Sequence, residues 1–164
     1  MNHDPAAEAR RKAGGAAAKE SDFVSVLIGG QLFGIPVLQV QDVLNPQRIT
    51  RVPLAPPEVA GSLNLRGRIV TAIDIRTRLG LPEIAEGKQR MSVVVDHGGE
   101  LYSLMVDQVG EVLSLSETAF EHNPATLDPR WREVSAGIYR LDAKLLVVLD
   151  VARLLVLSPR AEAA

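Results

Sequence analysis

The strongest constraint on the fold is an internal repeat. Residues 29–44 aligned with residues 98–113, an offset of 69 positions, give eight identities in 16 positions. Residues 61–81 aligned with residues 137–157, an offset of 76, give five identities in 21. Five of the other 16 pairs in the second alignment exchange one aliphatic residue for another, all within residues 69–75, so the apolar pattern of that stretch is kept as well. A chain that repeats in this way contains one structural unit twice.

Each unit consists of short β-rich runs separated by turns. Residues 23–28 and 32–35 flank Gly29-Gly30 as in a hairpin, and residues 63–75 predict a second hairpin. An open sheet of about five short strands exposes two edges, whereas a small closed barrel removes them. We therefore predict an all-β fold of two packed barrels with a groove between them. Two further predictions are a helical turn leading into a strand over residues 37–44 and a polar loop over residues 121–135.

The composition of the ends differs from that of the centre. Residues 1–22 are rich in alanine, glycine and charge, which predicts a flexible N-terminal tail. We expect the folded domain to span residues 23–157 and residues 158–164 to form a C-terminal tail. Within the domain, we place subdomain one at about 23–88 and subdomain two at about 89–150, with the C-terminal segment returning to pack between them.

Charge is distributed unevenly along a chain whose net charge is only −2. Residues 23–90 carry eight basic and five acidic side chains, and residues 91–164 carry six basic and eleven acidic ones. Such asymmetry favours oriented association with partner proteins over general binding of polyanions. Cysteine is absent, which excludes disulfides and thiolate sites, and no apolar run approaches the ~20 residues of a membrane span. These features predict a cytoplasmic protein.

The residues that could perform chemistry do not form a catalytic or metal-binding pattern. His3, His97 and His122 have no metal-ligand spacing to one another. Asp74 and Asp150 occupy equivalent positions of the repeat, each before a helical turn, where helix N-capping accounts for both. No Lys-Ser/Thr follows the Gly-Gly pairs as in a phosphate-binding loop. We therefore expect no enzymatic activity, no cofactor and no metal.

Nucleic-acid binding is an alternative, because Arg48, Arg51, Arg66 and Arg68 could form a basic stripe on a small barrel. Aromatic residues make up only 4% of the chain, which leaves few platforms for base stacking. The acidic second half would also repel phosphate. We therefore expect protein partners and no nucleic acid.

Arg66 is the residue whose role the repeat leaves open. It precedes Gly67 at a turn with apolar neighbours, and its equivalent in the second unit is Asp142, which carries the opposite charge. The turn itself therefore does not require arginine. An arginine beside apolar residues is typical of protein interfaces, whereas the alternative is an ordinary solvated turn residue.

Several stretches together resemble the CheW family, the coupling proteins of bacterial chemosensory arrays. The similarity extends over about residues 22–156. It rests on Gly34-Ile35-Pro36-Val37-Leu38-Gln39-Val40-Gln41-Asp42-Val43, Ile49-Thr50-Arg51-Val52-Pro53, Asn64-Leu65-Arg66-Gly67 within residues 59–70, residues 106–115 and residues 145–155.

This resemblance implies two SH3-like five-stranded β-barrels and a non-enzymatic adaptor. The implied partners are the cytoplasmic tip of chemoreceptors and the regulatory domain of the histidine kinase CheA, whose own CheW-like fold would permit ring assembly. The implied receptor groove contains Val37, Val40 and Asp42, with Val106 from the other barrel, and Arg66 lies at the receptor or kinase contact. The protein would lie at the inner face of the membrane through receptor arrays. The alternatives are a CheW-like scaffold of a non-flagellar pathway, with type IV pili or another output, and the nucleic-acid-binding barrel considered above.

Overall fold

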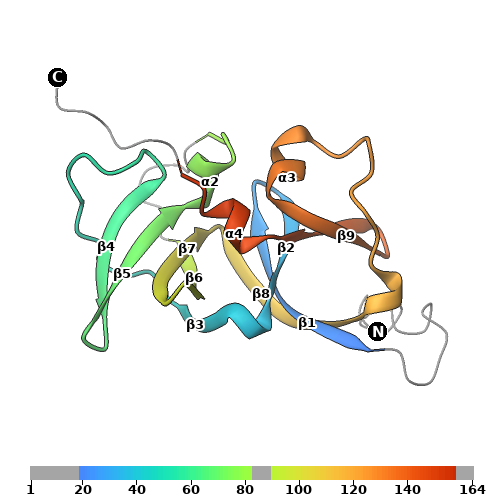
Figure 1. Cartoon of the computed structure of the whole chain (residues 1–164), viewed down its shortest axis with the longest axis horizontal. Helices are drawn as coiled ribbons and strands as arrows, with labels where there is room; N and C mark the ends of the chain where they lie inside the picture. Colours follow the sequence, from blue (N-terminus) through green and yellow to red (C-terminus); the bar gives the residue numbers. More distant parts are fainter. Residues whose placement is uncertain (1–18, 83–89, 158–164) are drawn as a thin grey trace.

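The computed structural model describes residues 19–82 and 90–157. Most of the expected N-terminal tail, residues 1–18, and the expected C-terminal tail, residues 158–164, lie outside these residues. The described part is mostly strand and forms two five-stranded sheets that lie beside each other (Figure 1). The predicted all-β architecture with short helical turns is confirmed.

Each sheet curls into a small SH3-like barrel. Barrel one has the strand order β8-β1-β2-β10-β9. Its strands are β1 (Glu20–Ile28), β2 (Gln31–Pro36), β8 (Gln108–Ser116), β9 (Ser135–Leu141) and β10 (Lys144–Leu149). Barrel two has the order β3-β6-β7-β5-β4. Its strands are β3 (Val40–Leu44), β4 (Val59–Leu65), β5 (Arg68–Asp74), β6 (Met91–His97) and β7 (Glu100–Val106).

The barrels do not follow the predicted division near residue 88. Barrel two is continuous from residue 40 to residue 106, whereas barrel one combines residues 20–36 with residues 108–149. The reason is an exchange of hairpins between the two repeats. The β1–β2 hairpin joins three strands of the second repeat through the parallel pair β2·β10, and β6–β7 joins three strands of the first through β5·β7.

Two local predictions also need correction. Strand β1 begins at Glu20, inside the expected tail, because Glu20 to Asp22 pair with β8 through their backbones although their side chains are polar. The segment predicted as a loop at residues 121–135 contains helix α3 (Pro129–Val134). Asp128 caps α3 by accepting a hydrogen bond from the Arg130 N–H, and Pro129 occupies the first helical turn.

The largest apolar core lies between the barrels. It combines Val24, Val26 and Ile28 of β1 with residues of β6 and β7, and includes Val151 and Leu154 of helix α4 (Val151–Leu154). Figure 1 shows α4 between the two barrels. Each barrel also has a smaller interior cluster of its own. The barrels are therefore joined by packing as well as by the chain.

The predicted capping roles of two aspartates are confirmed. Asp74 accepts a hydrogen bond from the Thr77 N–H at the start of helix α2 (Ile75–Arg78), and Asp150 accepts one from the Arg153 N–H at the start of α4. The two helices are joined because the Arg78 side chain donates to the Leu154 carbonyl oxygen at 2.9 Å.

An ion pair between Arg76 and Asp107 also ties the barrels together. Arg76 of α2 donates through Nε and Nη2 to the two carboxylate oxygens of Asp107, at 2.8 and 2.7 Å. Asp107 lies between β7 and β8, where the chain returns to barrel one, and also accepts a hydrogen bond from the Gly29 N–H of the β1–β2 turn. Both side chains are largely buried, with 18% and 17% exposure. We call these three residues the Arg76–Asp107 clamp.

In each sheet an edge strand, β4 or β9, is crossed by a segment from elsewhere in the chain, at equivalent positions of the repeat. Thr50 forms a bridge with Ser62 of β4, and Glu121 forms one with Ile138 of β9. A Cβ atom added at Gly61 would lie 2.3 Å from the Thr50 carbonyl oxygen. The covering segment therefore passes so close to the strand that position 61 has room only for glycine.

Substituting Gly61 by alanine should destabilise the fold by about 2 kcal/mol, as expected for overpacking against a backbone atom. The measurement is the free energy of unfolding in urea. Gly67→Ala is the matched control, because Gly67 also has a positive φ, 83°, but open space around its Cβ position. The control should cost only about 1 kcal/mol of backbone strain. Equal losses for the two variants would contradict the predicted clash.

Candidate interaction surface

The first connection between the barrels presents an apolar side chain to solvent. Helix η1 (Val37–Gln39) carries the chain from β2 to β3. Val37 and Val40, both predicted partner contacts, are half-buried and pack against the central core. Leu38 between them is 97% exposed. Beside η1 lies a hollow of about 430 Å³ that is lined by Phe23, Pro36, Val37 and Leu38 among others.

The second connection is different at the equivalent position. The repeat aligns Leu38 with Asp107, which forms the Arg76–Asp107 clamp. The second connection is therefore fixed against barrel two, while at the first connection no element of residues 19–82 and 90–157 covers the Leu38 side chain. An exposed apolar residue next to a hollow is characteristic of a protein-binding surface.

Arg66 lies in a two-residue turn that ordinarily favours glycine or asparagine. Leu65 pairs with Arg68, and the intervening Arg66 and Gly67 have φ values of 51° and 83°, as in a type I′ turn. The Asn64 side chain accepts a hydrogen bond from the Gly67 N–H at 2.9 Å. The equivalent place in the β6–β7 turn is occupied by Gly98. Arginine in this left-handed conformation costs about 1 kcal/mol or more, so stability does not explain its presence.

Two of the predicted site residues contact each other. The Arg66 guanidinium donates through Nη2 to Asp42 Oδ2 at 3.2 Å. The Arg66 side chain is 80% exposed and that of Asp42 is 26% exposed, so solvent screens the pair and it contributes little to stability. The contact brings the tip of the β4–β5 hairpin to β3 and holds the arginine head in one place on the surface.

The same positions in barrel one carry a different charge pattern. The equivalents of Asp42 and Arg66 are Glu111 and Asp142, so the second unit has two carboxylates where the first has an ion pair. The difference extends to the whole barrels. Residues 40–106 carry eight basic and seven acidic residues, a balance of +1, whereas residues 20–36 and 108–149 together carry four basic and eight acidic ones, a balance of −4.

Val106 does not line an open groove, and it does not come from the other barrel. It ends β7 in barrel two, the same barrel as Asp42 and Arg66, and its exposure is 0%. Its side chain belongs to the core between the barrels. The correction follows from the exchange of hairpins, which places β3 and β7 in one sheet.

Three exposed apolar side chains near the predicted residues were missed. Val43 follows Asp42 on β3 and is 39% exposed, and Ile69 on β5 is 76% exposed. Leu38 is the third. For Ile69, strict alternation with buried Val70 would have indicated an outward position. For Leu38, the signal was the charged residue Asp107 at its repeat position.

The part of the chain that the structure describes contains neither a cluster of metal-ligating side chains nor a helix that could cross a membrane. No group of three or more histidine, aspartate or glutamate side chains able to hold a metal ion occurs within residues 19–82 and 90–157. Among the helices of these residues, none has the length and hydrophobicity that a membrane-crossing helix requires.

Two SH3-like barrels that exchange hairpins and expose an apolar connection define an all-β domain with a surface suited to protein contacts. Residues 22–158 match the model of the CheW-like domain. The chain therefore belongs to the CheW-like domain family.

Known proteins of this type are similar over most of their length. The chemotaxis protein CheW of Helicobacter pylori is 28% identical over 152 residues, which cover 89% of this chain and 92% of that protein. CheW of Klebsiella aerogenes is 28% identical over 134 residues, covering 82% of this chain and 81% of that protein. The crystal structure of the scaffolding protein TtCheW from Thermoanaerobacter tengcongensis has a TM-score of 0.72 at 27% identity, covering 86% of this chain and 99% of that one.

Proposed function

We propose that this protein is a non-enzymatic adaptor that couples chemoreceptors to a histidine kinase of the CheA type. The observation that carries the proposal is the surface formed by the exposed Leu38 and the Asp42–Arg66 pair, on a domain of the CheW-like family. Receptor and kinase would meet on the cytoplasmic side of the membrane, in receptor arrays at its inner face.

The receptor contact is assigned to the first connection between the barrels. Leu38, with half-buried Val37 and Val40, offers apolar contacts to a helical hairpin such as a chemoreceptor tip. Asp42 lies on the same strand as Val40 and adds a carboxylate at the edge of this surface. An adaptor transmits signals when its affinity differs between the states of its partners, so this contact should depend on the signalling state of the receptor.

Arg66 is assigned to the kinase contact. Its left-handed conformation, its exposure and its anchoring by Asp42 support a role in binding another protein. The charge balances of +1 for barrel two and −4 for barrel one also suit head-to-tail contacts with related CheW-like domains. Contacts of this heterologous kind close into rings when the rotation permits.

The experiment that tests the function is reconstitution with a kinase and a receptor. The protein should make kinase autophosphorylation dependent on receptor and attractant, while the protein alone shows no phosphotransfer. Kinase activity that responds equally to receptor with and without the protein would refute the adaptor role.

Leu38→Asp should weaken binding to receptor by at least about tenfold, because a carboxylate would be desolvated in an apolar contact. Since Leu38 is 97% exposed, the free energy of unfolding should change by less than about 0.5 kcal/mol. Binding can be measured with receptor-containing nanodiscs. Val112→Asp is the control, since Val112 is an exposed valine on β8 of barrel one that does not line the hollow beside η1. An equal loss for both variants would show a general charge effect.

A second candidate is a coupling scaffold of a non-flagellar chemosensory pathway. It is retained because protein PilI of Pseudomonas aeruginosa is 28% identical over 120 residues, covering 73% of this chain and 67% of that protein. Identification of the kinase that co-purifies with the protein from its own cells distinguishes the two pathways.

A further inference from the structure

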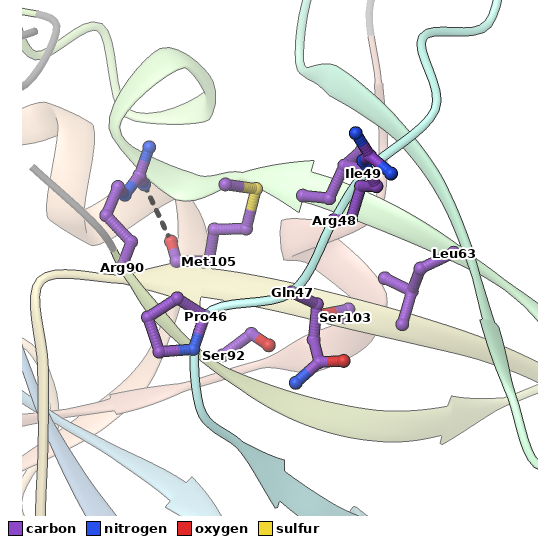
Figure 2. Close-up of a pocket in the computed structure, with 9 residues that line it drawn as sticks. All are labelled: Pro46, Gln47, Arg48, Ile49, Leu63, Arg90, Ser92, Ser103 and Met105. Atoms are coloured by element: carbon purple, nitrogen blue, oxygen red, sulfur yellow. Dashed lines mark hydrogen bonds between the residues drawn. The ribbon is translucent and has the colours of Figure 1, made fainter. Parts of the chain in front are cut away.

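The two barrels carry hollows at equivalent places of the repeat. The hollow beside η1 is lined by Phe23 and Pro36, which pair with each other across β1 and β2. Their equivalents are Ser92 and Met105, which pair across β6 and β7 and line a hollow of about 420 Å³ in barrel two (Figure 2). The repeat therefore allows the two surfaces to be compared directly.

The charges around the two hollows are opposite in sign. Among the residues that the structure describes, the lining of the hollow beside η1 includes three acidic residues, Glu20, Asp22 and Glu117, and no basic one. The lining of the other hollow includes Arg48 and Arg90 and no acidic residue (Figure 2). An occupant that suits the hollow beside η1 therefore carries positive charge.

The hollow beside η1 also combines uncovered apolar surface with carboxylates that lack a cation. Leu38 at this hollow is 97% exposed. Within residues 19–82 and 90–157, neither Asp22 nor Glu117 forms an ion pair, and each accepts a hydrogen bond from a serine hydroxyl, of Ser114 and Ser21 respectively. Long basic side chains suit such a surface, because their aliphatic parts can lie against apolar groups while their charged ends reach the carboxylates.

In both barrels the chain enters the β-hairpin beside the hollow. In barrel two, Arg90 stands immediately before β6, lines the hollow and forms two hydrogen bonds with the Asp74 carboxylate, at 2.9 and 3.0 Å. In barrel one, the corresponding chain enters β1 through Lys19. The Lys19 carbonyl oxygen accepts a hydrogen bond from the Glu117 N–H at 2.8 Å, which fixes this residue at the hollow beside η1. The residues that precede Lys19 therefore start at the edge of this hollow.

The sequence before β1 has the charge that the hollow lacks. Residues 9–19 contain four basic side chains, Arg10, Arg11, Lys12 and Lys19, and no acidic one. Lys12 is seven residues from Lys19, which is at most about 25 Å of extended chain, so residues 10–12 can reach the hollow. Gly14-Gly15 lies between them, and glycine readily adopts the conformations that a reversal of the chain requires.

We propose that the N-terminal segment folds back and occupies the hollow beside η1. The three basic side chains of residues 10–12 pair with the carboxylates around the hollow, and their aliphatic parts lie against Leu38. Exposed ion pairs are individually weak, but the tether gives the segment an effective concentration in the millimolar range. The segment thereby competes with any partner that binds this surface. The docking itself does not depend on the adaptor role.

The test measures the position of the segment in the full-length protein. A nitroxide label is attached at Ala9→Cys, which is specific because the chain contains no cysteine. The paramagnetic relaxation of the Leu38 methyl NMR signals reports how often the label lies at the hollow. The comparison is the same labelled protein with Arg10→Gln/Arg11→Gln/Lys12→Gln, called the neutral variant, in which the tether has the same length and only the charges differ.

Relaxation at Leu38 should be at least about threefold faster with the native segment than in the neutral variant. It should fall to the value of the neutral variant in about 0.5 M sodium chloride, because exposed charges are screened there. Ile69, an exposed residue of β5 in barrel two, should show no difference between the two proteins.

Variants of the hollow provide the reciprocal test. Asp22→Asn/Glu117→Gln removes two of the carboxylates and should reduce the relaxation at Leu38 as far as the neutral variant does. Glu100→Gln is the matched control, since Glu100 is an exposed acidic residue of β7 that does not line the hollow, and it should have no effect. Equal effects of these two changes would show a general dependence on net charge and overturn the proposal.

Equal relaxation with the native segment and in the neutral variant would also overturn it. If the native protein then bound vesicles containing phosphatidylserine and the neutral variant did not, the basic residues would be assigned to a membrane surface instead.

A second measurement rests on the proposed function. If receptor binds at Leu38, the neutral variant should bind receptor in phosphatidylcholine nanodiscs about twofold more tightly, because the surface is no longer occupied. Faster relaxation at Leu38 without this gain in affinity would support the docking and contradict the receptor contact at Leu38. Failure of the docking and failure of the proposed function are therefore distinguishable.

Discussion

Arg66→Glu should abolish co-purification with the kinase, with at least about a hundredfold loss of affinity, and change the free energy of unfolding by less than about 1 kcal/mol. The reversal places two carboxylates together where Arg66 now contacts Asp42. Because the arginine is 80% exposed, the folded protein tolerates this locally, whereas a partner that recognises the guanidinium loses its contact and meets repulsion.

Matched variants separate a direct contact from a structural effect. Arg140→Glu reverses an arginine of barrel one that also pairs with a carboxylate, Glu121, and is 59% exposed, so it should leave assembly intact. The double variant Asp42→Arg/Arg66→Glu restores the ion pair with its two charges exchanged. Because the positive charge is then at position 42, this protein should remain unable to bind the partner. Recovery of binding in the exchanged protein would show that only the ion pair matters. Undiminished co-purification of Arg66→Glu with both partners would remove Arg66 from the interaction surface.

Asp107→Asn should lower the free energy of unfolding by about 3 kcal/mol at pH 7, because the Arg76–Asp107 clamp joins the two barrels and is largely buried. The variant leaves the Arg76 guanidinium without its charged partner and weakens the acceptor for the Gly29 N–H. Glu121→Gln breaks an exposed ion pair of the same type and should cost less than about 1 kcal/mol. Urea unfolding of both variants provides the comparison.

The effect of Asp107→Asn should depend on pH in a defined direction. Burial by itself raises the pKa of the Asp107 carboxyl, but hydrogen bonds from Arg76 and Gly29 and the nearby positive charges outweigh it and hold the pKa below its usual value. The stabilisation is therefore complete above the unfolded pKa of about 3.9 and is lost as pH falls through the lower folded pKa. The difference between wild type and variant should shrink between pH 5 and the folded pKa. A difference that stays constant over this range would exclude the ion pair as its cause.

Much of the architecture could be predicted from the sequence because the signals for hairpin turns and helix caps are local. The Gly-Gly pairs have positive φ values as hairpin turns require, and Asp74 and Asp150 cap helices where the repeat placed them. The Asn64-Leu65-Arg66-Gly67 stretch was also correctly identified as a turn.

The pairing of the repeats could not be predicted from these signals. Because the two units have the same strand pattern, the β1–β2 hairpin fits a barrel made from either unit, and only the course of the connections at η1 and Asp107 decides between them. The error about Val106 follows directly from this ambiguity. The exposure of Leu38, in contrast, was not predicted because its neighbours are apolar. A leucine close to Val37 and Val40 in the sequence resembles a core residue.

The exchange of hairpins also affects how the chain is made. After Pro36 ends β2, the ribosome must add residues 37–107 before the first residue of β8 appears. At usual rates of synthesis, about 5–20 residues per second, this interval is roughly 4–14 seconds. Throughout it, Phe33 and Ile35, fully buried in the finished protein, have no sheet to join. The nascent β1–β2 hairpin is therefore the segment that we expect chaperones to protect, while barrel two folds as soon as β7 leaves the exit tunnel.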